Sequence, residues 1–209
     1  MYAHIGRYVA AATLAGYGCL YVLGRLAGST ARERRAALPG DALVPRPNAV
    51  TNHAITVDAP PEAVWPWLAQ LGWHLGGYYT PRWVDRLLFP RNWASLDHLD
   101  PALVRDLHVG DIIPDGPPGT AWYVVAAVDA PHHLVLHSTT HVPQRWRAKF
   151  GTMIDWTWTF HLTPLPARRS RLHLRVRGRT APWWLTASYH AAIVPSDYVM
   201  AGGMLRGIR

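Results

Sequence analysis

Apolar residues occupy every second position from 154 to 162 and again from 172 to 176, with polar residues between them. Successive side chains of a β-strand point to opposite faces, so this alternation predicts two strands that are each apolar on one face. A proline-containing turn at 164–169 joins them into a hairpin. A shorter alternating pattern at 54–58 predicts another strand. Residues 121–128 and 133–138 are rich in β-forming residues and are predicted to form a second hairpin. One covered face and one polar face are typical of an antiparallel sheet.

Helical spacing is found on both sides of these strands. After Pro60 and Pro61, apolar residues recur at Val64, Leu68 and Leu71, and Gly72 is expected to end this helix. A short helix is predicted from Pro81 to Phe89, with Trp83, Leu87 and Leu88 on one side. From about Trp183 the pattern is helical again, with a stripe formed by Val194, Tyr198, Ala201, Leu205 and Ile208. Strand, helices, several strands and a long terminal helix together predict an α+β fold with an antiparallel sheet.

Residues 8–24 form a run without a charge, between Arg7 and Arg25. About 17 apolar residues is the lower limit for a helix that spans a bilayer. We expect a membrane anchor within residues 1–30; a cleaved signal peptide and a helix packed on the domain are the alternatives. Four arginines follow the run and one precedes it, so the positive-inside rule places the main domain in the cytoplasm. A soluble cytoplasmic protein is the alternative localisation.

Residues 31–50 contain three prolines near their end and are interpreted as an extended linker, which leaves 51–209 as the folded domain. The net charge is +8, divided equally between residues 1–50 and 51–209. The domain is thus only mildly basic, and no nucleic-acid partner is expected. The basic residues around Arg168–Arg179 are interpreted as a solvated outer sheet face that can also touch anionic headgroups. Nothing indicates a particular protein partner.

No metal or cofactor is expected. Cys19 is the single cysteine, so no intrachain disulfide can form. His133, His137 and His141 recur every four residues, which on a strand separates successive pairs by about 13 Å, too far to share one ion. The chain contains no phosphate-binding or dinucleotide-binding glycine motif.

The segment Trp65–Trp83 holds six aromatic residues, including four of the eleven tryptophans, together with three glycines. Tryptophan is large and amphipathic and often lines a surface instead of filling a core. Gly76 and Gly77 permit a close backbone approach or a positive φ. The alternative interpretation is that these rings only pack in the core.

Three sequence segments resemble segments of one protein superfamily. They are Ile55–Gly72, which reads ITVDAPPEAVWPWLAQLG; Gly76–Tyr79 followed by Trp83-Val84-Asp85; and Pro195–Met200 with Met204–Ile208. They are similar to bacterial members of the START-like superfamily, which includes polyketide cyclases, lipid-transfer domains and the major birch pollen allergen. The resemblance covers residues 51–209. It implies a helix-grip fold, in which a curved antiparallel sheet wraps around the long terminal helix and encloses a cavity.

That resemblance implies that the cavity binds a hydrophobic small molecule or lipid. The residues expected to bind it are Trp67, Leu71, Trp73, Tyr78, Tyr79, Trp83, Trp156, Trp158, Phe160 and Tyr198. A cyclase-like enzyme acting on an apolar substrate is the alternative, with Asp85 and Tyr79 as weak catalytic candidates. The favoured interpretation of Asp85 is a surface partner of Arg82 or Arg86. Asp197 is expected in the first turn of the terminal helix, where its charge meets the helix dipole. A structural domain without a ligand is the third possibility.

Overall fold

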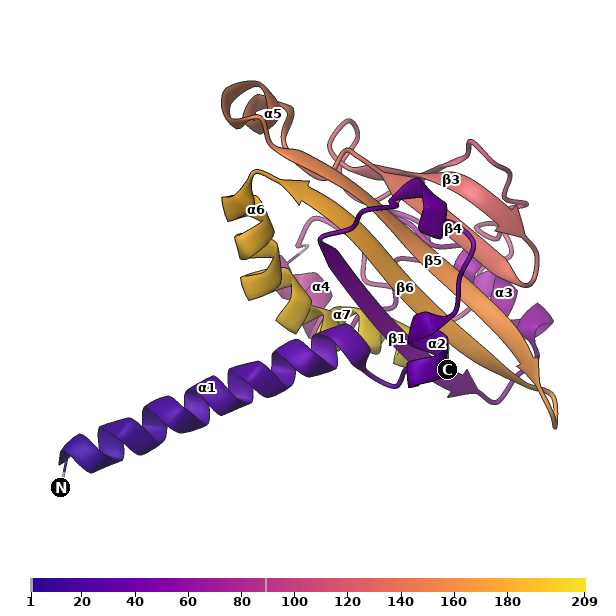
Figure 1. Ribbon diagram of the computed structural model, residues 1–209. Coiled ribbons are helices and arrows are strands. Elements are labelled where there is room, and N and C mark those ends of the chain that lie inside the picture. Colours follow the sequence, from indigo (N-terminus) through magenta and orange to yellow (C-terminus); the bar gives the residue numbers. More distant parts are fainter. Residues whose placement is uncertain (1, 89) are drawn as a thin grey trace.

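The computed structural model describes residues 2–88 and 90–209 of the chain. Six strands form one antiparallel sheet in the order β1-β6-β5-β4-β3-β2 (Figure 1). The strands are β1 Ala49–Val57, β2 Ile112–Pro114, β3 Trp122–Asp129, β4 His133–Ser138, β5 Met153–Leu165 and β6 Arg169–Ala181. The alternation at 154–162 and 172–176 falls within β5 and β6, and this confirms the predicted hairpin.

The helices cover mainly one face of the sheet (Figure 1). They are α1 Tyr2–Leu26, α2 Ala31–Arg35, α3 Pro61–Ala69, α4 Arg82–Leu88, α5 Gln144–Phe150, α6 Trp183–Ser188 and α7 Val194–Ile208, with a 3-10 turn η1 at Asp41–Leu43 and a π-helical turn η2 at Tyr189–Ile193. The short helix expected to end at Phe89 is described only as far as Leu88, because Phe89 lies outside the described residues. The α+β class and the long terminal helix are both confirmed.

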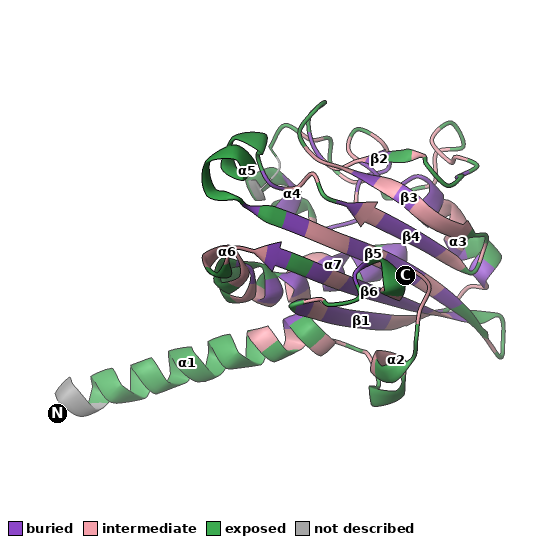
Figure 2. Cartoon of the chain, turned by 45° about the horizontal axis from the view of Figure 1, so that its top comes forward, coloured by how far each residue is buried: buried purple, intermediate pink, exposed green. Residues whose placement is uncertain are grey.

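The core lies between the sheet and the helices α3 and α7. Phe160 on β5 and Leu172 and Leu174 on β6 are fully buried, as is Leu68 on α3. Figure 2 shows that much of β5 and β6 is buried. Met204 extends the same cluster from α7. The four residues on α3, β5 and β6 belong to the apolar faces that the sequence pattern predicts, whereas Met204 lies outside the predicted stripe of the terminal helix. A curved antiparallel sheet packed around a long terminal helix is the helix-grip architecture.

The terminal helix is continuous from α6 through η2 to α7. The amide of Val194 donates to the Tyr189 carbonyl, five residues earlier, which is the hydrogen bond of a π-turn. Pro195 has no amide hydrogen for the Ala191 carbonyl. The hydroxyl of Tyr17 on α1 donates to that carbonyl instead, at 2.8 Å. The proline therefore marks a turn inside a longer helix and not its beginning.

The last part of α1 packs against the beginning of α7. A Cβ placed on Gly24 would lie 1.7 Å from the Val194 carbonyl oxygen, so only glycine permits this approach. Tyr21 Oη lies 2.9 Å from His190 Nδ1. Residues 5–20, in contrast, are exposed, and Ile5–Leu26 is long and apolar enough to cross a membrane by length and composition. The helix thus combines a docked end with a free apolar part.

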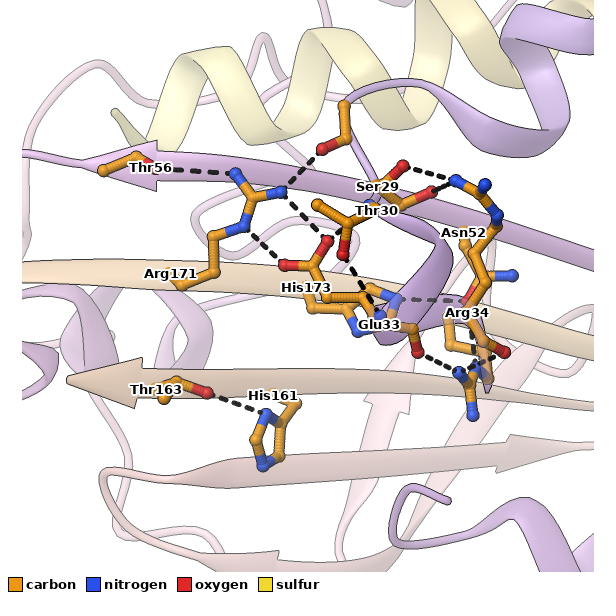
Figure 3. Close-up of polar contacts among 12 residues, drawn as sticks. Ser29, Thr30, Glu33, Arg34, Asn52, Thr56, His161, Thr163, Arg171 and His173 are labelled. Carbon is orange, nitrogen blue, oxygen red and sulfur yellow. Dashed lines mark hydrogen bonds and ion pairs between the residues drawn. The ribbon is translucent and has the colours of Figure 1, made fainter. Parts of the chain in front are cut away.

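The outer face of the sheet is covered along the middle of β6, so Arg171, Arg175 and Arg177 are not solvated as expected. Arg168, Arg169 and Arg179 are exposed, as predicted. Residues 28–48 lie across β1 and β6 and supply acceptors to the guanidinium groups of β6. Figure 3 shows the contacts between Arg171 on β6 and Glu33 on α2. Arg171 contacts Glu33 at 2.6 Å, and this hydrogen bond lowers the pKa of Glu33 to about 2. Thr30 and Glu33 form a capping box at the start of α2. The segment interpreted as a linker is therefore folded onto the domain.

Candidate ligand cavity

A cavity of about 250 Å³ lies between the sheet and α7. Its walls come from the strands β3, β5 and β6, from α4, η2 and α7, and from the loops after α3, α4, β2 and β4. The residues lining it are Tyr78, Thr80, Asp85, Asn92, Asp115, Tyr123, His141, Trp156, Trp158, Val176, Tyr189, Ile193, Asp197, Met200, Ala201 and Met204. A hollow interior at this position is what the helix-grip architecture implies.

Aromatic rings form a continuous wall on the sheet side. Trp156 and Trp158 are two residues apart on β5, so both point to the same face. Tyr123 on β3 contacts both rings, with its ring centroid 6.4 Å from that of Trp156 and 5.3 Å from that of Trp158. Tyr78 meets Trp158 edge-on at 6.0 Å, and Tyr189 meets Trp156 edge-on at 6.1 Å. The rings hold one another in place and leave their remaining faces to the cavity.

Two hydrogen-bond donors in this wall have no partner among the described residues. They are the Tyr123 hydroxyl and the indole nitrogen of Trp156, and both atoms are buried. A buried donor without a partner is destabilising by roughly 1–3 kcal/mol. Both residues line the cavity. A molecule inside it could satisfy them.

Asp197 places a carboxyl group on the helical wall. It is 9% exposed, and the hydroxyl of Thr51 on β1 donates to its Oδ2 at 3.1 Å. Burial raises the pKa of Asp197 to about 7, against the opposing effect of the Thr51 hydrogen bond. Asp197 lies in the first turn of α7, as expected. Its charge does not meet a free helix N-terminus, because α6 and η2 continue the helix before it.

Asp85 also lines the cavity and is 6% exposed. Its carboxylate accepts hydrogen bonds from the hydroxyl of Thr80 and from Ser95, whose amide and hydroxyl lie at 3.2 and 3.1 Å. The favoured surface interpretation is therefore wrong, and Arg82 pairs instead with Asp97 at 3.0 Å. Three hydrogen-bond donors therefore occupy much of the acceptor capacity of the Asp85 carboxylate.

The local backbone explains how Asp85 is held. Gly77 has a φ of +79°, and a Cβ there would lie 2.7 Å from the Cα of Ser95. Only glycine lets this loop approach Ser95 so closely. Ser95 in turn binds both Asp85 and the amide of Tyr79, at 3.0 Å. The glycine pair seen in the sequence thus positions a cavity carboxylate.

His141 and Asp115 face each other at the cavity wall. His141 Nε2 lies 2.8 Å from Asp115 Oδ2, and its Nδ1 lies 2.8 Å from the hydroxyl of Ser138. His137 contacts Asp155 instead, at 2.7 Å. No group of three or more potential metal-ligating side chains comes together among the residues that the structure describes.

The expected ligand-binding residues separate into two groups. Tyr78, Trp156 and Trp158 line the cavity. The others do not line the cavity. Leu71 and Phe160 are fully buried in the core, and Tyr79 is buried there with its hydroxyl donating to the carbonyl of Trp67, whose ring packs edge-on against it. Trp73 stacks on His74, Trp83 is 59% exposed, and Tyr198 is half-buried. The aromatic segment before residue 84 therefore contributes one ring to the cavity.

Sequence reasoning missed Tyr123, Tyr189 and His141 as cavity residues. A signal existed for Tyr123, which shares the inward face of β3 with Val125. Another existed on the terminal helix, where the cavity residues 189, 193, 197, 200 and 204 recur at helical spacing. His141 follows β4 in a loop, and no periodic pattern indicates its direction.

No family model and no curated protein matches the chain. Solved structures are similar to it at low identity. A Mycobacterium smegmatis protein is 16% identical over 76% of this chain and 87% of its own, with a TM-score of 0.44. A Thalictrum norcoclaurine synthase is 13% identical over 76% and 95%, with a TM-score of 0.38. A Plasmodium falciparum HSP90 activator is 15% identical over 61% and 71%, with a TM-score of 0.36. At this level the similarity concerns the fold alone.

Proposed function

We propose that the domain binds a compact hydrophobic small molecule in the cavity between the sheet and α7. The observation that carries the proposal is the pair of buried donors, Tyr123 Oη and Trp156 Nε1, that have no partner within the described chain. Binding pockets are mostly apolar, with a few polar groups that orient the ligand. An aromatic wall with two free donors has this composition.

The size of the cavity narrows the ligand class. An engineered apolar cavity of about 150 Å³ is enough to bind benzene. A volume of about 250 Å³ therefore suits a molecule of one or two rings better than a lipid with two long chains. A hydrogen-bond acceptor on the ligand, such as a hydroxyl or carbonyl oxygen, would meet the free donors.

A cavity-filling substitution tests the proposal. Ala201 lines the cavity, whereas Ala192 lies on the same continuous helix and is exposed. We expect native mass spectrometry of the gently purified wild-type protein to show a retained small molecule. Ala201→Phe should lose that mass, and Ala192→Phe should keep it, with thermal denaturation confirming that both variants fold. Equal retention by the two variants, or no retained molecule in the wild type, would contradict binding in this cavity.

We also propose that α1 anchors the domain to a membrane. Its support is the exposed apolar part at residues 5–20 and the excess of arginine after the helix, which favours a cytoplasmic domain. We expect the full chain to stay in the membrane fraction after alkaline carbonate extraction. A variant without residues 2–16, which keeps the docking residues Tyr17, Tyr21 and Gly24, should be soluble.

A control separates anchoring from docking. Gly24→Leu should prevent the packing of α1 on the Val194 carbonyl while leaving the exposed apolar part of the helix unchanged. We expect this variant to remain in the membrane fraction. Its release into the soluble fraction would mean that the membrane association depends on the docked arrangement and not on the helix alone.

Catalysis on the bound molecule is the second candidate function. It is favoured by one observation, the contact of His141 with Asp115 at the cavity wall, because a histidine oriented by a carboxylate is suited to general acid–base chemistry. Asp85 is a further titratable group there. Tyr79, the other candidate, has its hydroxyl engaged with the Trp67 carbonyl. A retained molecule that changes mass on incubation would favour this function.

A further inference from the structure

The charged groups of the cavity are unbalanced. Three carboxyl groups, from Asp85, Asp115 and Asp197, line it, and no lysine or arginine does so among its described lining residues. Asp115 is matched by His141 at 2.8 Å, and Asp85 accepts three hydrogen bonds from Thr80 and Ser95. The hydroxyl of Thr51 is the one side-chain partner recorded for Asp197 in the described chain, and it binds a single oxygen.

The surroundings of Asp197 suit a positive charge in a second way. The cavity wall contains the rings of Tyr78, Tyr123, Trp156, Trp158 and Tyr189, and the negative faces of such rings attract cations. An aromatic box with a carboxylate is a common arrangement for recognising ammonium groups, because the carboxylate supplies a charge-assisted hydrogen bond. An anionic ligand, in contrast, would meet carboxylates and no arginine or lysine among the described lining residues.

We propose that the ligand of this cavity is a compact organic cation, an ammonium group carried on a small hydrophobic body, with Asp197 as its counter-ion. The inference rests on the proposed binding function and specifies its ligand class. The ammonium group donates to the Asp197 oxygen that Thr51 leaves free. The hydrophobic body fills the space beside Met200 and Met204, which line the same helical wall. An acceptor atom on the body meets the indole N–H of Trp156, which is buried without a partner.

Three probes with the same ring and different charge test the proposal. They are 2-phenylethylamine, which is protonated at pH 8, neutral 2-phenylethanol, and the anion phenylacetate. Isothermal titration at pH 8 and physiological salt measures each affinity for the full chain. We expect the amine to bind at least about tenfold more tightly than the alcohol, and phenylacetate to bind most weakly.

Two variants test whether Asp197 causes the preference for the amine over the alcohol. Asp197→Asn keeps the shape of the side chain and removes its charge. The affinities of this variant for the amine and the alcohol should therefore differ by no more than about twofold, and the alcohol should still bind. Asp155→Asn is the matched control, because Asp155 contacts His137 and does not line the cavity. It should keep the wild-type preference. Survival of the preference in Asp197→Asn would overturn the role of Asp197.

The outcomes for the probes separate this inference from the proposed function. If the alcohol or phenylacetate binds as tightly as the amine, the proposal of a cationic ligand is wrong, while the proposed binding of a hydrophobic molecule still stands. Failure of all three probes to bind would overturn a compact cation as the ligand. In that case, the retained mass and its loss in Ala201→Phe still decide independently whether the cavity binds anything.

Discussion

Asp197→Asn is expected to raise the free energy of unfolding by about 4 kcal/mol at pH 8, and by almost nothing near pH 4. Burial raises the pKa of Asp197 from 3.8 to about 7 in the folded protein. Each pKa unit corresponds to about 1.4 kcal/mol. Below pH 3.8 the carboxyl group is neutral in both states, so it has no pH-dependent effect. As the pH rises to 7, the unfolded chain ionises first, and the folded state is destabilised progressively.

The measurement is the difference between variant and wild type in urea unfolding from pH 4 to pH 8. Taking the difference removes the contributions of other groups. Burial lowers the pKa of His53 and of His173 from 6.5 to about 4, so both histidines stabilise the fold above pH 6.5 and lose that effect as the pH falls toward 4. Those changes are common to both proteins. Only the Asp197 contribution remains in the difference.

The exposed Asp58 provides a control for the general effect of removing one negative charge from a basic protein. Asp58→Asn should change the stability by less than about 0.5 kcal/mol at every pH, as surface substitutions usually do. An Asp197→Asn difference that is independent of pH, or a variant less stable than the wild type at pH 8, would contradict the buried, destabilising carboxylate. A group that destabilises the fold and yet faces a cavity is expected where binding requires it.

The sheet and the terminal helix could be predicted from the sequence because their signals are local and periodic. The alternation within β5 and β6 indicates which residues face the core, and four of the five residues in the stripe from Val194 to Ile208 are buried in α7. The exception is Tyr198, which is half-buried. Both patterns follow from the geometry of a strand and a helix. The α+β class then follows from the order of the elements.

The cavity residues could be predicted only in part, because loops redirect side chains without a periodic signal. Tyr78 and Tyr79 are adjacent in the sequence, yet Tyr78 faces the cavity and Tyr79 points into the core. Tyr79 has a φ of +54°, in the left-handed region, and follows Gly77 at +79°. A pattern of residue types does not specify these angles. The role of Asp197 was hidden for a related reason, since Pro195 is typical of a helix start and the π-turn lets the helix continue.

The covering of the outer sheet face could not be predicted, because its contacts join residues more than 120 positions apart. Arg175 alternates with apolar residues and so resembles a solvated strand position. Its side chain is in fact 3% exposed. The acceptors around it are mostly backbone carbonyls of the segment 33–36, at 2.8 to 3.1 Å. Any residue supplies a carbonyl, so the side chains of that segment give no signal for this role.

Replacement of Arg175 is expected to have the largest destabilising effect in the domain. Its guanidinium group also donates to Asn52 at 2.9 Å and to Asp41 at 2.7 Å. Removing one partner of a buried ion pair is destabilising by about 3–5 kcal/mol. We therefore expect Arg175→Ala to lose about that much stability in urea unfolding. Arg179→Ala, on the same strand but exposed, should lose less than about 0.5 kcal/mol.

Two further measurements distinguish the effect of the several hydrogen bonds made by the Arg175 guanidinium group from the effect of its charge alone. Arg175→Lys keeps the charge, but an ammonium group has three donors and cannot reach acceptors on both sides as a planar guanidinium does. It should recover only part of the lost stability. Hydrogen exchange should show the amides of residues 33–43 losing protection in Arg175→Ala and keeping it in Arg179→Ala. Unchanged protection, or a return to wild-type stability in Arg175→Lys, would mean that residues 28–48 are held on the sheet by contacts other than the hydrogen bonds of the Arg175 guanidinium group.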